Sequence, residues 1–171
     1  MWRRGIGLFL TMVFLAAVSA YSAEVKIGFV DLQRVLSESK RGQEAKAKIE
    51  ARGNELDKQF QQMQKEVQAL KEEIDKKGKL LSANALKEKQ REYEQKLKQL
   101  ETFVQNSRQE LQEMEREAVA QILKDAEKVI SDIGKREGYT VILEKQRSFI
   151  LFAPDEIDLT DRVIKALDAQ R

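Results

Sequence analysis

The feature that most constrains this chain is a heptad pattern of apolar residues in two stretches, one on each side of Gly78. Apolar residues at alternating steps of three and four form one narrow stripe on a slightly underwound α-helix. The first stretch carries Leu56, Phe60, Met63, Val67, Leu70 and Ile74. The second carries Leu86, Tyr93, Leu97, Leu100, Val104, Leu111 and Met114. Two such helices joined by a tight turn are expected to pack antiparallel as a long α-hairpin, here called the arm.

Residues suited to helix ends bound both helices of the arm. Ser37 or Ser39 suits the N-cap of the first helix, and Ser82 suits the N-cap of the second. Gly138 is expected to follow the second helix in the left-handed conformation. The apolar pattern slips near Ala118 and continues at steps near four, which is where the second helix is expected to leave the arm.

Charged residues on the arm occur as acid–base pairs spaced four apart, the order that favours a helix. We interpret them as a solvated helix surface rather than as a code of ion pairs. The pairs are Glu44/Lys48, Glu72/Lys76, Glu73/Lys77, Glu92/Lys96 and Glu94/Lys98.

The segments on both sides of the arm predict a small β body. Residues 25–31 alternate as a strand, and residues 139–143 and 149–152 are expected to form a β-hairpin through a polar turn. A last helix, capped by Thr160, carries Val163, Ile164 and Leu167 on one face. The predicted fold class is therefore mainly α with a small β part (α+β), in which the arm, residues 40–137, is inserted into a three-stranded base formed by residues 24–39 and 138–171.

Both faces of the predicted sheet are apolar, and one helix covers only one of them. Because few apolar residues remain for a globular core, we expect copies of the chain to cover the second face. The residues expected to hold the copies together are Val25, Ile27, Phe29, Val141, Leu143, Phe149 and Leu151.

The N-terminus has the layout of a secretory signal peptide over residues 1–23. Arg3 and Arg4 precede an apolar stretch that is shorter than the roughly 20 residues needed to span a bilayer, and small residues follow it. We expect export and cleavage after Ala20 or Ala23, and an uncleaved anchor is the alternative. Removal of residues 1–23 takes away two of the 31 basic residues and none of the 29 acidic ones, so the exported chain is neutral and offers no argument for nucleic-acid binding.

The composition argues against enzyme chemistry. The chain has no histidine and no cysteine, which removes the common metal ligands, the usual nucleophile pairs and histidine-based proton transfer. Gly78 and Lys79 are followed by Leu80 rather than Ser or Thr, so they do not begin a phosphate-binding loop. Acidic pairs such as Glu72 and Glu73 lie on a predicted exposed helix without an enclosing pocket. We expect no catalysis, no cofactor and no metal site.

One local charge excess remains, at the tip of the arm. Between residues 71 and 91, seven basic residues face four acidic ones. This cluster is either an ordinary solvated turn or a site of attraction for anionic lipid head groups or acidic clients. Its main members are Lys71, Lys76, Lys77, Lys79 and Lys87.

Three segments, taken in order, carry a resemblance to a known family. The strand at residues 26–31 (KIGFVD), the long charged α-hairpin and the segments at 138–143 (GYTVIL) and 157–161 (IDLTD) resemble the Skp/OmpH family of periplasmic chaperones over nearly all of the exported chain. The resemblance implies a homotrimer, with a β-barrel body made by three subunits and three helical tentacles around a cavity. It also implies ATP-independent binding of unfolded outer-membrane β-barrel proteins in the periplasm. Well-known members are strongly basic, whereas this exported chain is neutral, which argues against strong contact with lipid or lipopolysaccharide.

The main hypothesis is a holdase chaperone that binds unfolded outer-membrane proteins through many weak contacts. The alternatives are a structural coiled-coil scaffold of the cell envelope and a protein that contacts anionic lipid through the tip of its arm. The sequence does not assign which face of the arm meets a client.

Overall fold

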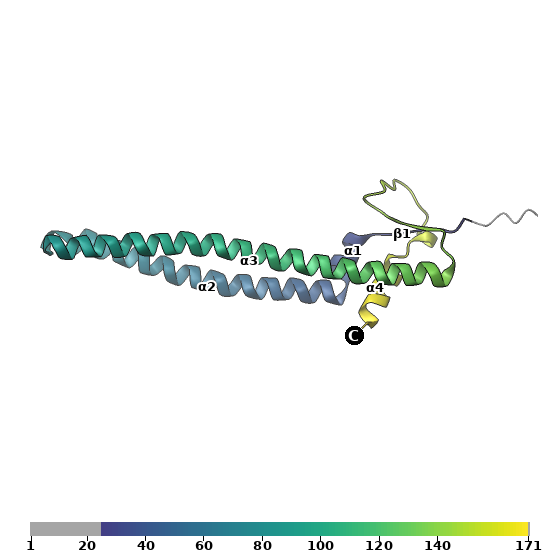
Figure 1. The fold of residues 1–171 in the computed structure, drawn as a ribbon, viewed down its shortest axis with the longest axis horizontal. Coiled ribbons are helices and arrows are strands. Elements are labelled where there is room, and N and C mark those ends of the chain that lie inside the picture. Colours follow the sequence, from purple (N-terminus) through teal and green to yellow (C-terminus); the bar gives the residue numbers. More distant parts are fainter. Residues whose placement is uncertain (1–24, 171) are drawn as a thin grey trace, which may run out of the picture.

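A long two-helix arm projects from a small base in the computed structural model, which describes residues 25–170 (Figure 1). The predicted signal peptide lies outside these residues. The arm consists of α2 (Lys40–Lys77) and most of α3 (Ala83–Glu137), which run antiparallel. At 1.5 Å per residue, the 38 residues of α2 extend about 57 Å. Within residues 25–170, no helix is long and apolar enough to cross a bilayer.

The ends of the arm helices follow from capping. The Ser39 hydroxyl accepts a hydrogen bond from the Gly42 amide at the start of α2, and Ser82 does the same for Ala85 at the start of α3. A short 3₁₀ turn, Gly78–Leu80, reverses the chain between them. At the end of α3, Gly138 adopts φ 70°, and the Tyr139 amide donates to the Gly134 carbonyl at 3.0 Å. Ser39, Ser82 and Gly138 thus take the roles that the sequence predicts.

The last third of α3 leaves the arm and forms the centre of the base. There it packs against α1 (Leu32–Glu38), α4 (Thr160–Ala169) and the first strand, β1 (Ile27–Val30). This transition follows Ala118, where the apolar pattern slips. The buried core residues of the base are Val30, Val35, Ile122, Ala126, Val129, Ile133, Leu159, Val163 and Leu167.

Within residues 25–170, two strands form one parallel sheet. β1 pairs with β2 (Val141–Glu144), with Ile27 opposite Val141 and Phe29 opposite Leu143. On the other edge of β1, Phe29 forms an isolated parallel bridge with Asp158. The mainly helical fold with a small β part is confirmed, and a chain segment around Asp158 takes the place beside β1.

The predicted β-hairpin is wrong for the single chain. Residues 145–149 make turns, and residues 150–154 have no regular structure. Phe149 adopts φ 50°, a left-handed backbone that ends strand geometry. Leu151 and Phe152 are 98% and 88% exposed, so no packing within residues 25–170 holds this segment extended as a strand. β2 instead pairs with β1, because the return of α3 to the base brings Val141 beside Ile27 in the parallel direction.

The sequence predicts that Thr160 caps the last helix, and this prediction is wrong. Thr160 is the first residue of α4 and is fully buried, and its hydroxyl accepts a hydrogen bond from the Asp31 amide at 2.9 Å. The Asp158 carboxylate accepts from the Thr160 amide at 2.8 Å instead. Thr160 therefore ties the start of α4 to the end of β1.

The joint between α1 and α2 is unusually close. A Cβ atom added to Gly42 would lie 1.8 Å from the Leu36 carbonyl oxygen, whereas one added to Gly53, further along α2, would meet nothing within 4 Å. Only glycine therefore lets α2 pass so near the end of α1.

We expect Gly42→Ala to lower the free energy of unfolding by about 2 kcal/mol or more, because backbone must move to relieve the overlap. The matched variant Gly53→Ala is expected to raise it by roughly 0.5–1 kcal/mol, since alanine favours a helix interior. Urea unfolding followed by circular dichroism measures both. Equal effects of the two variants would contradict the close approach at the joint.

Candidate functional site

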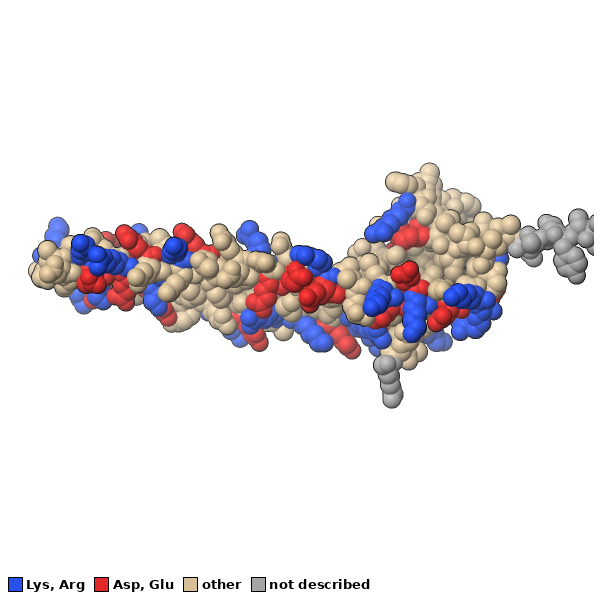
Figure 2. Space-filling model, viewed as in Figure 1, with Lys and Arg blue, Asp and Glu red and all other residues tan. Residues whose placement is uncertain are grey.

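The outer side of the base exposes a group of apolar side chains, here called the apolar base patch. Ile27 and Val141 are register partners on the sheet and point away from the helical core, and the loop after β2 adds three more large residues. Figure 2 shows that much of the base surface on the side of this loop carries no charge. The patch consists of Val25, Ile27, Val141, Phe149, Leu151 and Phe152, which are 62%, 43%, 38%, 84%, 98% and 88% exposed.

Five of the seven residues predicted to join copies of the chain belong to this patch. The other two differ: Phe29 is 5% exposed and Leu143 is half-buried within the single chain. The ammonium nitrogen of Lys145 lies 5.9 Å from the centre of the Phe29 ring. Phe29 is thus covered by its own chain. Phe152 was not singled out from the sequence, although it ends the same apolar run.

The backbone of β2 is also incompletely paired. Its ladder runs to β1 on one side, and among the described residues no strand lies on its other side. An exposed strand edge beside exposed apolar side chains is a typical site for pairing with another chain.

The predicted basic cluster lies at the far end of the arm, and all five lysines are exposed. Lys76 pairs with Glu72 at 3.2 Å. Hydrogen bonds from Gln68 and then Lys76 lower the pKa of Glu72. The other four lysines, Lys71, Lys77, Lys79 and Lys87, make no ion pair within residues 25–170.

An apolar residue accompanies these lysines. Leu80, in the 3₁₀ turn, is 86% exposed. The heptad pattern does not mark Leu80 as a surface residue, although its place outside both heptad stretches is a signal that it has no partner helix.

Three ion pairs join the two helices of the arm. Arg52 of α2 bonds Glu110 of α3 at 2.6 Å. Nearer the tip, Lys96 of α3 bonds Glu66 at 2.8 Å. A third pair joins Lys89 to Glu73 at 3.1 Å.

These bonds shift the pKa values of their partners. The hydrogen bond from Lys96 lowers the pKa of Glu66, and the one from Arg52 lowers the pKa of Glu110. The hydrogen bond to Glu73 raises the pKa of Lys89.

The interpretation of the arm charges as a solvated surface fits most of these residues, which are exposed, and needs correction for two of them. Of the five predicted pairs, Glu72–Lys76 forms, whereas Glu73 and Lys96 bond to the opposite helix. Charged residues that flank an apolar stripe lie near the partner helix. Their position beside the stripe is therefore the sequence signal for ion pairs between the two helices. The two helices are thus joined by one ion pair in the half of the arm nearer the base and by two nearer the tip.

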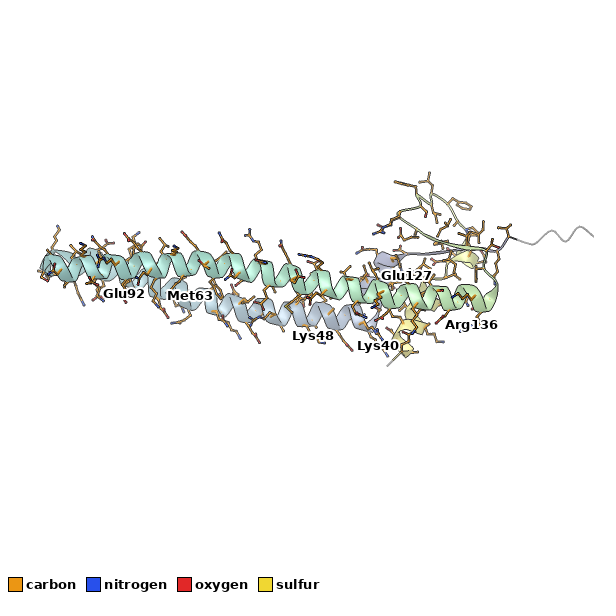
Figure 3. All side chains as sticks on the ribbon, viewed as in Figure 1. Lys40, Lys48, Met63, Glu92, Glu127 and Arg136 are labelled. Atoms are coloured by element: carbon orange, nitrogen blue, oxygen red, sulfur yellow. The ribbon has the colours of Figure 1, made fainter. Side chains whose placement is uncertain are left out.

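Between the Arg52–Glu110 and Lys96–Glu66 ion pairs, shallow grooves open at the middle of the arm on either side of Phe103. One groove is lined by Met63 and polar residues of α3. The other is lined by Leu56, Phe60, Val104 and Leu111. Met63 lies on the arm well away from the base (Figure 3). Such grooves offer partly apolar contact surface without an enclosed binding pocket.

Comparison with known proteins places the chain in a family. A family model described as outer membrane protein (OmpH-like) matches residues 26–167. The chain belongs to this OmpH-like family. The resemblance noted from the sequence is thereby confirmed.

A solved structure shows the same OmpH-like fold. The crystal structure of a candidate outer membrane chaperone (OmpH-like) from Caulobacter crescentus CB15 matches with a TM-score of 0.79 at 17% sequence identity. The match covers 100% of this chain and 92% of that chain. At this identity the likeness establishes the fold alone. A search of curated proteins gave no match.

Proposed function

We propose that this OmpH-like protein is an ATP-independent holdase of the periplasm, which keeps unfolded outer-membrane β-barrel proteins soluble until they are inserted. Membership of the family supports this role, as does the chaperone assignment of the structure that shares the fold. The observation that carries the proposal is the projecting arm, whose middle presents open, partly apolar grooves around Phe103.

Weak contacts at several places suit such a client. An unfolded β-barrel protein exposes apolar side chains and unpaired strand edges that otherwise aggregate. Several arms that each make shallow contacts hold it by multivalency, and each contact is weak enough to release without nucleotide. The role requires no catalytic group, cofactor or metal.

The assembly that we propose is a homotrimer. The apolar base patch includes residues of β1 and β2 and of the loop that follows β2, so it lies beside the open edge of β2. Both the patch and the edge are exposed in a single chain. Strands from three subunits closing into a barrel cover both at once, because a closed barrel has no free edge. Three arms then hang from one body and surround a common space.

The division of labour along the chain follows from this proposal. Residues 1–23 act as the export signal, cleaved after Ala20 or Ala23. Residues 24–39 and 138–171 build the body together with the last third of α3, and the rest of residues 40–137 forms the arm. The last third of α3, from Ile122 to Ile133, adds its apolar face to the body.

A second candidate activity is contact of the arm tip with an anionic membrane surface. Lys77 and Lys79, which make no ion pair in the described part of the chain, lie beside the exposed Leu80. They favour this activity, since an apolar side chain among cations suits a lipid interface. The neutral charge of the exported chain confines this attraction to the tip.

For the holdase role, we expect the purified exported chain to prevent light scattering when a urea-denatured outer-membrane β-barrel protein is diluted into buffer without ATP. Stoichiometric amounts of the trimer should suffice. Phe103→Ala removes the ring between the two grooves. Several-fold more of this variant than of the unaltered chain should be required to prevent the same light scattering. Tyr93→Ala serves as the control, because Tyr93 is also half-buried on α3 but lines neither groove. Aggregation that proceeds despite the unaltered chain would refute the role, and selective capture of one folded partner would indicate an envelope scaffold.

For the assembly, Val141→Asp and Leu151→Asp should each yield monomers in sedimentation velocity, because each places a charge in the proposed interface. Gln146→Asp adds the same charge at an exposed polar position of the same loop and should leave the oligomer intact. Phe29→Asp is a poorer test, since Phe29 is buried in its own chain. A monomeric unaltered chain excludes the trimer, and intact oligomers of both variants exclude this interface.

For the tip, Lys77→Gln combined with Lys79→Gln should weaken binding to anionic vesicles at low salt by roughly tenfold or more. Lys48→Gln combined with Lys58→Gln removes two exposed lysines nearer the base and should leave binding unchanged. Added salt should weaken the binding of the unaltered chain, because it screens exposed charges. Equal losses in both double variants would assign the tip no special role.

A further inference from the structure

The two helices of the arm are attached to the base in different ways. α3 passes from arm to base as one continuous helix, and its last third is buried in the core. α2 begins afresh at Lys40, after Ser39 breaks the chain direction with an extended backbone of φ −67° and ψ 150°. The start of α2 is therefore held to the base by non-covalent contacts in addition to the chain itself.

The contacts at the root of α2 come from the end of α4. The Lys40 amide donates a hydrogen bond to the Asp168 carboxylate at 2.9 Å. The neighbouring Arg41 donates to the Gln170 carbonyl at 3.0 Å and also pairs with Asp125 of α3. Figure 3 shows Lys40 where the start of α2 meets α4.

The chemistry of these contacts suits a helix start. The first amides of a helix have no acceptor within the helix, so the Lys40 amide depends on a group from elsewhere. A carboxylate there also interacts favourably with the positive end of the helix dipole. α4 presents this carboxylate from a firm position, because Val163 and Leu167 are completely buried in the core.

A further contact between α1 and α4 keeps the two ends of the joint together. Arg34 of α1 bonds Asp161 at the start of α4 at 2.8 Å and Glu38 at the end of α1, also at 2.8 Å. α4 thus spans the joint, with one end on α1 and the other on α2. Lys40 is exposed and Asp168 is half-buried, so the contact at the α2 end is open to water and can break without unfolding the core.

We infer that the last turn of α4, residues 167–170, acts as a clasp on the root of α2 and thereby controls bending of the arm. Two helices that are packed along their length bend together only if one slides slightly past the other. Interhelical ion pairs resist sliding further out, and the continuous α3 resists it at the base.

With the clasp closed the arm is attached at both roots and stays stiff. With the clasp open, only the close crossing at Gly42 and the Arg41–Asp125 pair hold the root of α2, which then tilts about that crossing so that the arm bends. This inference goes beyond the proposed chaperone role and does not depend on it.

Hydrogen exchange of the full exported chain tests the clasp directly. Asp168→Ala removes the acceptor and should speed exchange of the amides of residues 40–44 by about tenfold, the lower range for a lost hydrogen bond to a charged group. Asp168→Asn keeps an acceptor oxygen and should restore most of the protection. The control Asp132→Ala removes an exposed carboxylate of α3 that makes no hydrogen bond within residues 25–170, and should change nothing. Faster exchange throughout β1 and the base would overturn the inference, because Asp168 would then support the whole core.

A distance measurement tests the consequence for the arm. Because the chain has no cysteine, Lys46→Cys and Ser131→Cys introduce one spin label on α2 and one on the base portion of α3. Labelled chains are diluted with an excess of unlabelled chains so that only distances within one chain are recorded. Asp168→Ala should broaden the distance distribution by pulsed electron paramagnetic resonance, and Asp168→Asn should narrow it again. An unchanged distribution, with or without faster exchange at the root of α2, would overturn control of the arm by the clasp.

Discussion

Helix α3 packs one face against two different partners in succession, and both the arm and the base depend on it. Over its first part, the heptad stripe of α3 meets α2 and keeps the pair antiparallel. Beyond Ala118 the spacing shifts, and Ile122, Ala126 and Val129 meet α1, α4 and β1 instead. A single uninterrupted helix therefore transmits the orientation of the base to the arm. Shortening or kinking α3 at the transition would separate the two halves of the molecule.

The distribution of apolar surface explains why an OmpH-like chain is shaped in this way. The buried residues of the base lie on the helical side of the sheet, where α3 and α4 cover Val30. The opposite side is left with Ile27, Val141 and the loop around Leu151 exposed. In the arm, the stripe is just wide enough to hold two helices together, so that most of its side chains are only half-buried. Surface that is apolar but shallow suits weak contact with many unfolded chains better than tight contact with one.

The joint between base and arm combines a tight backbone contact at Gly42 with a weaker polar contact at Asp168. Gly42 passes so close to the Leu36 carbonyl that the crossing of α1 and α2 is fixed by the backbone. The contacts of Asp168 and Gln170 with the first turn of α2 are polar and accessible to water, and their energy is correspondingly modest. A fixed crossing and a weak clasp at the same joint allow the arm to change its shape while the base stays folded.

The sequence by itself determined the helical arm, its turn at Gly78, the cap at Ser82, a cap at Ser37 or Ser39 and a strand within residues 25–31. These features depend on periodicity and on local hydrogen bonds, which neighbouring residues specify. Only the tertiary structure decided that Glu66, Glu73 and Glu110 bond across the arm, that Phe29 is buried in its own chain and that residues 149–152 form no strand beside β2. It also decided that Thr160 joins α4 to β1 rather than capping the helix. The physical reason is the same in each case: these outcomes depend on which distant segment lies within hydrogen-bonding or packing distance, and α3 sets those distances by carrying the chain back to the base.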